Sequence, residues 1–248
     1  KNNIKIPQGA LNRFLSMNEF IMNLINKKGN ISQIGDSDNG MAIRLSSDKE
    51  FNLYASLLAS ASILSGREDF KAKGKGFEEE HYWLFGIDGF EKYASINSVN
   101  PKLNSRLFKE GGYVVFRKPS NNCKEEILMM DCGELGYLLT APHGHADLLS
   151  ITLSVDGIDL LIDPGTYLYH TGNGWRDYFR GTSAHNTITI NNKNQSEIKG
   201  PFMWGKRPMA RIHKWEVSDE NDCLSASCDN SRSSHKRSVY FNKKETMW

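Results

Sequence analysis

The stretch LSITLSVDGIDLLI at residues 149–162 contains the clearest fold signal in this sequence. Up to Val155, apolar residues alternate with serine and threonine, which is typical of a strand with one buried face. The dipeptide Asp156-Gly157 then predicts a two-residue hairpin turn. A hairpin folded about this turn pairs apolar residues on one face: Val155 with Ile158, Leu153 with Leu160, and Ile151 with Ile162. The stretch therefore predicts an antiparallel sheet.

Two further segments are predicted strands. Residues 113–116 form a short run of aromatic and β-branched residues. In residues 186–190 isoleucines alternate with threonines, so a third strand is expected there. By these registers Asp163 and His185 both fall on polar faces. Residues 221–237 are polar and rich in turn-forming residues, and no strand is predicted over them.

The first hundred residues show the helical period instead. A Ser-x-x-Glu capping box opens a predicted helix over residues 16–25, and a second one precedes a helix over residues 51–64 that Gly66 should cap. A shorter helix is expected over residues 78–85, ending at Gly86. The change of period predicts an α+β protein of two unequal parts, helical over residues 1–96 and β-rich over residues 97–248.

Composition narrows the function classes. With 31 basic and 29 acidic residues the formal net charge is +2, so neither a nucleic acid nor a membrane surface is an expected partner. The longest apolar stretch, residues 57–64, is far shorter than the roughly 20 residues that span a bilayer. The four cysteines lack metal-ligand spacing, so we expect ordinary thiols, with one disulfide possible in principle. The sequence starts at Lys1 without a leader and ends at Trp248 within an expected sheet, which suggests a processed or truncated product.

Three segments, residues 142–147, 162–167 and 175–187, concentrate functional side chains. His143 and His145 are two residues apart, so in extended chain their imidazoles point the same way, as neighbouring metal ligands do. With a carboxylate and a third histidine from nearby strands, the donor set would suit Zn²⁺. The alternative is a histidine pair that is simply solvated in a glycine-containing turn.

Four ordered motifs resemble the signature of the heparinase II/III-like family: HGHAD at residues 143–147, DPGT at 163–166, WRDYFR at 175–180 and SAHNT at 183–187. The run GDSDNG at residues 35–40 also resembles the family's loop near the end of its helical domain. The resemblance therefore covers nearly the whole chain.

The resemblance implies an α+β multidomain fold, in which the end of an α/α-toroid is followed by a layered antiparallel β-sandwich, with the active site in the cleft between them. It implies a zinc ion, in a mainly structural role, held by His145, Asp163 and His185. His143 would face the substrate cleft instead. A periplasmic or secreted location follows from the same resemblance.

The implied activity is that of a carbon–oxygen lyase, which cleaves acidic polysaccharides containing uronic acid, such as glycosaminoglycans or alginate, by β-elimination. Such an enzyme must neutralise the substrate carboxylate and supply a base for the C5 proton. Here His143 and Tyr178 are the candidates for proton transfer, and Arg176 and Arg180 for holding carboxylates or sulfates. Packing is the alternative role for Tyr178 and both arginines. The family's Asn-His pair and catalytic tyrosine are expected upstream of Lys1, so this chain would lack part of the active site.

The motifs also suggest alternative functions. A non-catalytic, zinc-stabilised protein that binds acidic glycan or assists polysaccharide biosynthesis would share the fold, because function belongs to the site. A dinuclear metallohydrolase needs a histidine where this chain has Leu148. Calcium binding by Asp36 and Asp38 is disfavoured because the loop lacks the spacing of an EF-hand, and a turn is expected.

Overall fold

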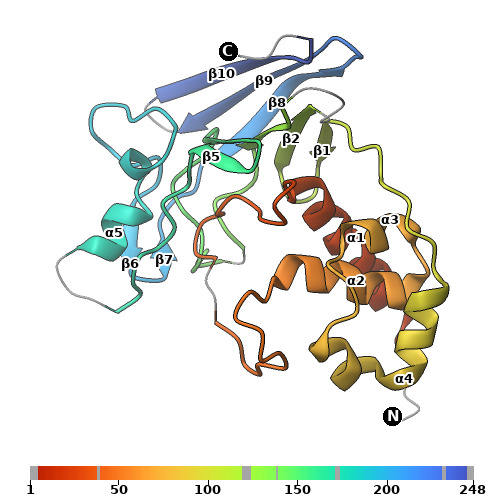
Figure 1. Cartoon of the computed structure of the whole chain (residues 1–248). Helices are drawn as coiled ribbons and strands as arrows, with labels where there is room; N and C mark the ends of the chain where they lie inside the picture. The colour runs from red at the N-terminus through yellow and green to blue at the C-terminus, as the bar shows by residue number, and fades with distance from the viewer. Residues whose placement is uncertain are drawn as a thin grey trace. The chain divides into compact units, whose positions relative to one another are not determined.

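The computed structural model describes residues 5–37, 40–118, 124–137, 139–170, 174–230 and 233–244, with backbone alone for residues 230 and 233. The chain forms two compact units, Lys1–Ile31 with Gly40–Leu103, and Ser32–Asn39 with Asn104–Trp248. Helices make up the first unit and antiparallel sheets dominate the second (Figure 1), which confirms the predicted α+β layout. Within the described residues, no helix is both long and apolar enough to cross a membrane.

The helices described in the first unit are α1 (Gln8–Leu24), α2 (Leu53–Ser65), α3 (Glu68–Lys73) and α4 (Glu79–Ser95). Burial of their apolar sides forms the core of this unit, since removing such side chains from water stabilises the packed state. The main cluster consists of Met22, Ile25, Leu58, Ala61, Phe70 and Leu103. Only α3 lacks a counterpart among the predicted helices.

The helix boundaries differ from those predicted. Ser16 lies inside α1, not at its start. Asn52 caps α2 by accepting a hydrogen bond in the first turn, whereas Ser47 bonds a glutamate of α4. Gly66 ends α2 in the left-handed conformation, as predicted. The last helix continues beyond Gly86, where non-helical dihedral angles mark a kink.

The second unit is a β-sandwich. One sheet has the order β1-β2-β3-β4-β5, and the other has the order β10-β9-β8. The strands of the first sheet are β1 (Arg106–Phe108), β2 (Tyr113–Lys118), β3 (Glu126–Asp131), β4 (Ile151–Val155) and β5 (Ile158–Leu161). Those of the second are β8 (Met209–Val217), β9 (Asn221–Asn230) and β10 (Ser233–Asn242). A small hairpin of β6 (Ile198–Gly200) and β7 (Met203–Trp204) completes the described strands.

Buried side chains from both sheets form the core of the sandwich. Phe116 of β2 contacts Trp215 of β8 and Phe241 of β10, with ring centroids 5.3 and 5.6 Å apart. The rest of the cluster is apolar and includes Val114, Leu128, Met130, Leu148, Leu149, Leu224, Ala226 and the thiols of Cys132 and Cys228. Cys132, Cys223 and Cys228 are free, and Cys123 lies outside the described residues.

The hairpin at Asp156-Gly157 is present, but its register shifts after the second pair, Ser154 with Asp159. Val155 pairs with Ile158 as predicted, whereas Leu153 pairs with Leu161 instead of Leu160 because of an irregularity at Leu153/Ser154. The expectation of one shared apolar face is wrong for β5. Its apolar residues are largely exposed, while the hydroxyl residues of β4 are buried.

Residues 186–190 do not form the predicted third strand; their one backbone pairing is an isolated bridge from Ile190 to Lys193. Side chains replace a ladder of backbone bonds in this segment. Asn186 donates to two backbone carbonyls, and Thr187 donates to the carbonyl of Leu148 at 2.8 Å. Alternation of isoleucine and threonine was therefore not sufficient to make a strand.

Residues 221–237, where no strand was predicted, lie mostly in the long hairpin of β9 and β10. The inward positions of β9 are Leu224, Ala226 and Cys228, all buried. Two of these three residues are small, and the segment is polar overall, so its apolar face was not recognised in the sequence. The physical alternation of period two was nevertheless present.

Candidate metal centre

His145, Asp163 and His185 come together in the sandwich unit. One ligand atom from each lies within 4.8 Å of the others. His145 Nδ1 is 3.1 Å from His185 Nε2, which is 3.7 Å from Asp163 Oδ1. Both histidines are buried and Asp163 is partly buried. The residues come from three separate segments, namely the loop before β4, the segment just after β5 and the residue after a 3₁₀ turn at Thr182–Ala184.

The nitrogen of each ring that faces away from this cluster has an acceptor. His145 Nε2 lies 2.8 Å from Asp36 Oδ1, and His185 Nδ1 lies 2.8 Å from the carbonyl oxygen of Gly181. Since a carboxylate and a carbonyl only accept, each of these nitrogens must carry the proton. The lone pairs of His145 Nδ1 and His185 Nε2 therefore face each other.

Two lone pairs at 3.1 Å repel unless a proton or a cation lies between them. Burial lowers the pKa of His185, an effect that Asp163 opposes. A tetrahedral metal with bonds of about 2.1 Å has ligand atoms roughly 3.4 Å apart, which lies between the two observed separations. The two nitrogens and one carboxylate oxygen fit a divalent metal ion, and three protein ligands leave one position open.

Backbone N–H groups orient the carboxylate of Asp163. Gly165 donates to Oδ1 at 2.8 Å and Gly35 donates to Oδ2 at 2.7 Å. Gly165 adopts φ 67°, a left-handed conformation that favours glycine in the Asp-Pro-Gly turn. The carboxylate thus has a set direction before any ion binds.

The histidine pair is held by close backbone packing. A Cβ on Gly144 would lie 2.8 Å from both Cα and N of Gly136, so only glycine fits between His143 and His145. Trp204 donates its indole N–H to the carbonyl of Gly144 at 2.7 Å. These contacts hold the loop that carries both histidines, but the environments of the two side chains differ.

His143 lies outside the metal cluster, and its side chain is 64% exposed. Its Nδ1 is 3.1 Å from Asp36 Oδ2, and its ring makes edge contacts with Tyr169 and Phe202. The second ring nitrogen has no partner among the described residues. The structure therefore places His145 in the cluster and His143 at the surface.

Asp36 was not predicted as a functional residue. Its side chain is buried, and its two oxygens bind His145, His143 and the guanidinium of Arg176. Burial alone would raise the pKa of Asp36, but the hydrogen bonds from His145 and Arg176 outweigh it and place the pKa well below its usual range. Asp36 is therefore an ionised acceptor. In the sequence, the one indication of its role was its place in the GDSDNG motif, which was interpreted as a turn.

Arg176 and Arg180 are both buried, at 4% and 0% exposure. All five N–H groups of Arg176 have acceptors: two oxygens of Asp36, the hydroxyl of Thr166 and the carbonyls of Pro142 and Pro201. Arg180 bonds Asp177 and two carbonyls, and stacks on Trp204 at 4.6 Å. Neither guanidinium is exposed to a ligand in this arrangement, which supports packing as their role.

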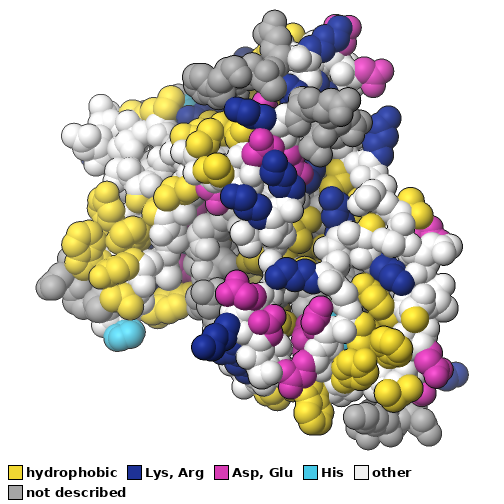
Figure 2. Space-filling view, viewed as in Figure 1, with side chains coloured by type: hydrophobic (Ala, Val, Ile, Leu, Met, Phe, Trp, Pro, Cys, Tyr) yellow, Lys and Arg dark blue, Asp and Glu magenta, His cyan; other side chains and the backbone are white. Residues whose placement is uncertain are grey.

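Tyr178 lies in the short helix α5 (Trp175–Phe179) with 53% of its surface exposed. It makes edge contacts with Trp175 and Phe179, and Tyr167 contacts the same two rings. Figure 2 shows hydrophobic side chains gathered over this helix. The structure places Tyr178 in an exposed aromatic group, whereas Tyr169 is the tyrosine that contacts His143.

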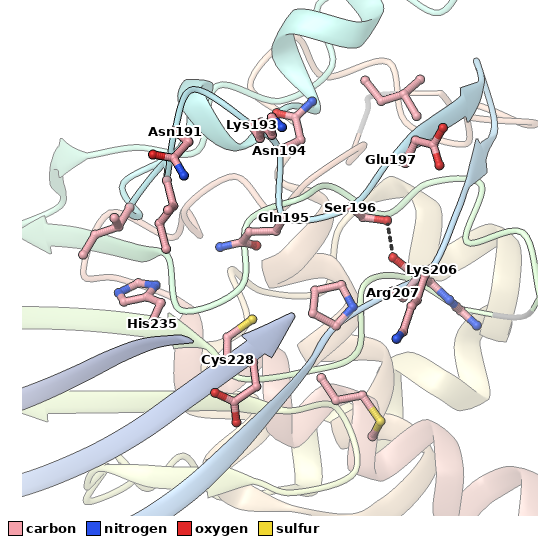
Figure 3. A pocket seen from close by; sticks show the side chains of 16 residues that line it. Asn191, Lys193, Asn194, Gln195, Ser196, Glu197, Lys206, Arg207, Cys228 and His235 are labelled. Carbon is pink, nitrogen blue, oxygen red and sulfur yellow. Dashed lines mark hydrogen bonds between the residues drawn. The ribbon is translucent and has the colours of Figure 1, made fainter. Parts of the chain in front are cut away.

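A large hollow lies in another part of the same unit. Its volume is about 900 Å³, and residues 188–198 and 206–209 form most of its wall (Figure 3). His235 and Cys228 come from paired positions of β10 and β9 and also line it. None of the predicted site residues belongs to this wall. One residue of the wall, Gln195, hydrogen-bonds the backbone N–H and carbonyl of Leu148, three residues after His145.

Comparisons with known proteins agree with this picture. Residues 100–248 match the sequence model of the family described as Heparinase II/III-like, C-terminal. No curated protein matches the chain.

Solved structures provide the likeness of fold. Heparan sulfate lyase HepC from Pedobacter heparinus is 20% identical, with a TM-score of 0.66 over 96% of this chain and 32% of that chain. A structure of heparinase III is 16% identical, with a TM-score of 0.67 over 97% of this chain and 34% of that chain. The chain spans about a third of the length of these proteins. Because the sequence match extends over more than half of its residues, the protein belongs to the heparinase II/III-like family.

Proposed function

We propose that this chain is part of a polysaccharide lyase that cleaves uronic-acid-containing glycans by β-elimination, and that it carries the enzyme's metal-binding sandwich. The observation that carries the proposal is the pairing of a buried His-Asp-His cluster with an exposed histidine, His143, two residues from the first ligand. Family membership supports the lyase chemistry, and the solved structures that carry the names heparan sulfate lyase and heparinase favour a glycosaminoglycan over alginate. A periplasmic or secreted location would suit such a substrate.

In the proposed reaction, His143 accepts the C5 proton of the uronate on its outer nitrogen. The electron pair of the C5–H bond forms the C4–C5 double bond, and the bond from C4 to O4 breaks. A proton delivered to O4 completes the elimination, and Tyr178, an exposed residue, is the candidate donor in this chain.

We propose that Zn²⁺ is the ion at His145, Asp163 and His185, because a set of two imidazoles and one carboxylate suits zinc. When bound, the ion supplies positive charge that holds the three segments together. Its role is mainly structural. Arg176 and Arg180 serve as internal supports, and another cation must neutralise the uronate carboxylate.

A second candidate function is non-catalytic binding of acidic glycan with the same zinc site, as in a polysaccharide-biosynthesis accessory protein. One observation favours it. The two arginines expected to hold substrate carboxylates are committed to internal hydrogen bonds.

The test combines metal analysis with an assay for unsaturated uronates. We expect one zinc per chain in the wild type and in His170→Ala, a control at an exposed histidine, and loss of zinc in His145→Ala and Asp163→Ala. Rising ultraviolet absorbance with heparan sulfate, hyaluronan or alginate supports the lyase, while zinc without turnover does not distinguish the glycan-binding function from a lyase whose active site needs residues outside this chain. Absence of zinc from the wild type would overturn the metal assignment.

A further inference from the structure

Asp36 lies on a short segment that precedes the sandwich in sequence but belongs to it in space. Its carbonyl oxygen accepts the hydroxyl of Tyr169 at 3.0 Å. The neighbouring Gly35 donates its N–H to Asp163, a candidate metal ligand. The backbone at Asp36 is therefore held on both sides by residues of the candidate site.

The carboxylate of Asp36 bridges two histidines. Oδ1 accepts His145 Nε2 at 2.8 Å, and Oδ2 lies 3.1 Å from His143 Nδ1. On its other side the fork of Arg176 binds Oδ1 at 2.5 Å and Oδ2 at 2.6 Å. Such a two-pronged bond restricts rotation of the carboxylate. Both oxygens thus point at their histidines.

This arrangement sets the proton on each ring. Since the carboxylate only accepts, His145 must carry its proton on Nε2, which leaves the Nδ1 lone pair facing His185. By the same reasoning His143 carries its proton on Nδ1, and its outer Nε2 lone pair is free to accept a proton from a substrate. One carboxylate therefore selects the ligand atom of one histidine and the basic atom of the other.

We infer that Asp36 is a positioning residue that couples the metal centre to the surface histidine by fixing both ring tautomers. This inference rests on the proposed function, because it assigns metal binding to His145 and proton transfer to His143. Acidic partners of metal-bound histidines commonly contribute 10- to 100-fold in metal affinity. Asp36 differs from such partners in that it also contacts a second histidine, His143.

The first experiment needs no substitution. Nitrogen-15 NMR of the histidine rings in the zinc-loaded chain should show His145 protonated on Nε2 and His143 protonated on Nδ1. If His143 is protonated on Nε2, or exchanges between both forms, the inference is overturned. The metal-free chain gives the same information for His143, so this readout remains decisive even if zinc does not bind.

The second experiment compares Asp36→Asn with Asp177→Asn by zinc competition against a chelator. Asp177 is a matched control, because it also pairs with a buried arginine, Arg180, but contacts neither histidine. We expect zinc affinity to fall 10- to 100-fold in Asp36→Asn and to stay unchanged in Asp177→Asn. His143 should also lose its single tautomer in Asp36→Asn alone.

A folded Asp36→Asn protein with wild-type zinc affinity and an unchanged His143 tautomer would contradict the inference. If Asp36→Asn does not fold, the histidine tautomers of the wild type test the inference. Failure of the wild type to bind zinc counts against the proposed function, while the tautomer of His143 still tests the role of Asp36.

Discussion

Gly144 is the residue whose size decides whether the two histidines of the HGH motif can take their positions. Its Cα packs against the backbone of Gly136, and an added methyl group would come within 2.8 Å of two backbone atoms there. Backbone atoms cannot move aside as a flexible side chain can. The loop would have to shift, carrying His143 and His145 with it.

We expect Gly144→Ala to destabilise the fold by about 1–3 kcal/mol, the usual cost of overpacking, and to weaken zinc binding. Urea denaturation and zinc content measure the two effects. Gly200→Ala is the matched control, because its Cβ would meet only Met203 Cβ at an ordinary 3.9 Å. Equal stability and zinc content in both variants would show that the loop tolerates the methyl group.

At the scale of elements, helix α2 shows how a local signal ends a helix. Gly66 adopts φ 77° at the C-terminal cap, and apart from its chain neighbours no atom of the described residues lies within 4 Å of the position a Cβ would occupy. The cost of a side chain there comes from backbone conformation and not from packing. Gly9, near the start of α1, also has open space around it but has no positive φ.

These two glycines provide a matched pair. Gly66→Ala should lower the free energy of unfolding by about 1 kcal/mol because L-residues disfavour the left-handed region. Gly9→Ala should leave it unchanged or raise it by up to about 1 kcal/mol, because alanine is the better helix former. Chemical denaturation followed by circular dichroism reports both. A loss in Gly9→Ala equal to that in Gly66→Ala would refute the conformational argument.

For the molecule as a whole, the metal centre joins segments that are distant in sequence. The three candidate ligands come from separate parts of the sandwich unit, and Asp163 also accepts a hydrogen bond from Gly35 of the 32–39 segment. A ligand that binds only the folded state stabilises it according to its concentration relative to its Kd. Zinc should therefore stabilise the sandwich unit.

With free zinc at about 100 times its Kd, the stabilisation is about 2.7 kcal/mol. This corresponds to a rise in Tm of roughly 5–10 °C for a chain of this size. A strong chelator should reverse the rise, and His185→Ala should show no response to zinc. Magnesium at the same concentration is the control, since it prefers oxygen ligands. A Tm that changes with neither zinc nor chelator would argue against a structural ion.

Local chemistry determined much of this protein from its sequence. The Asp-Gly hairpin, the cap at Gly66 and strand β2 depend on neighbouring residues, so the sequence predicted them correctly. The histidines and aspartate of the metal cluster were assigned from motif resemblance, and the structure brings those three residues together. Where alternation was masked by small residues, as in β9, or where side chains replaced the ladder, as at residues 186–190, sequence reasoning failed.

Only the tertiary structure decided how those residues are used. Asp36 meets His145 across 109 residues, and Arg176 meets Asp36 across 140, so no sequence period could connect them. Arg176 is held by Asp36 and Arg180 by Asp177 and two backbone carbonyls, so the two arginines expected to bind substrate make internal hydrogen bonds instead. A residue type limits which hydrogen bonds are chemically possible, but burial and the partners brought near by folding determine which ones form.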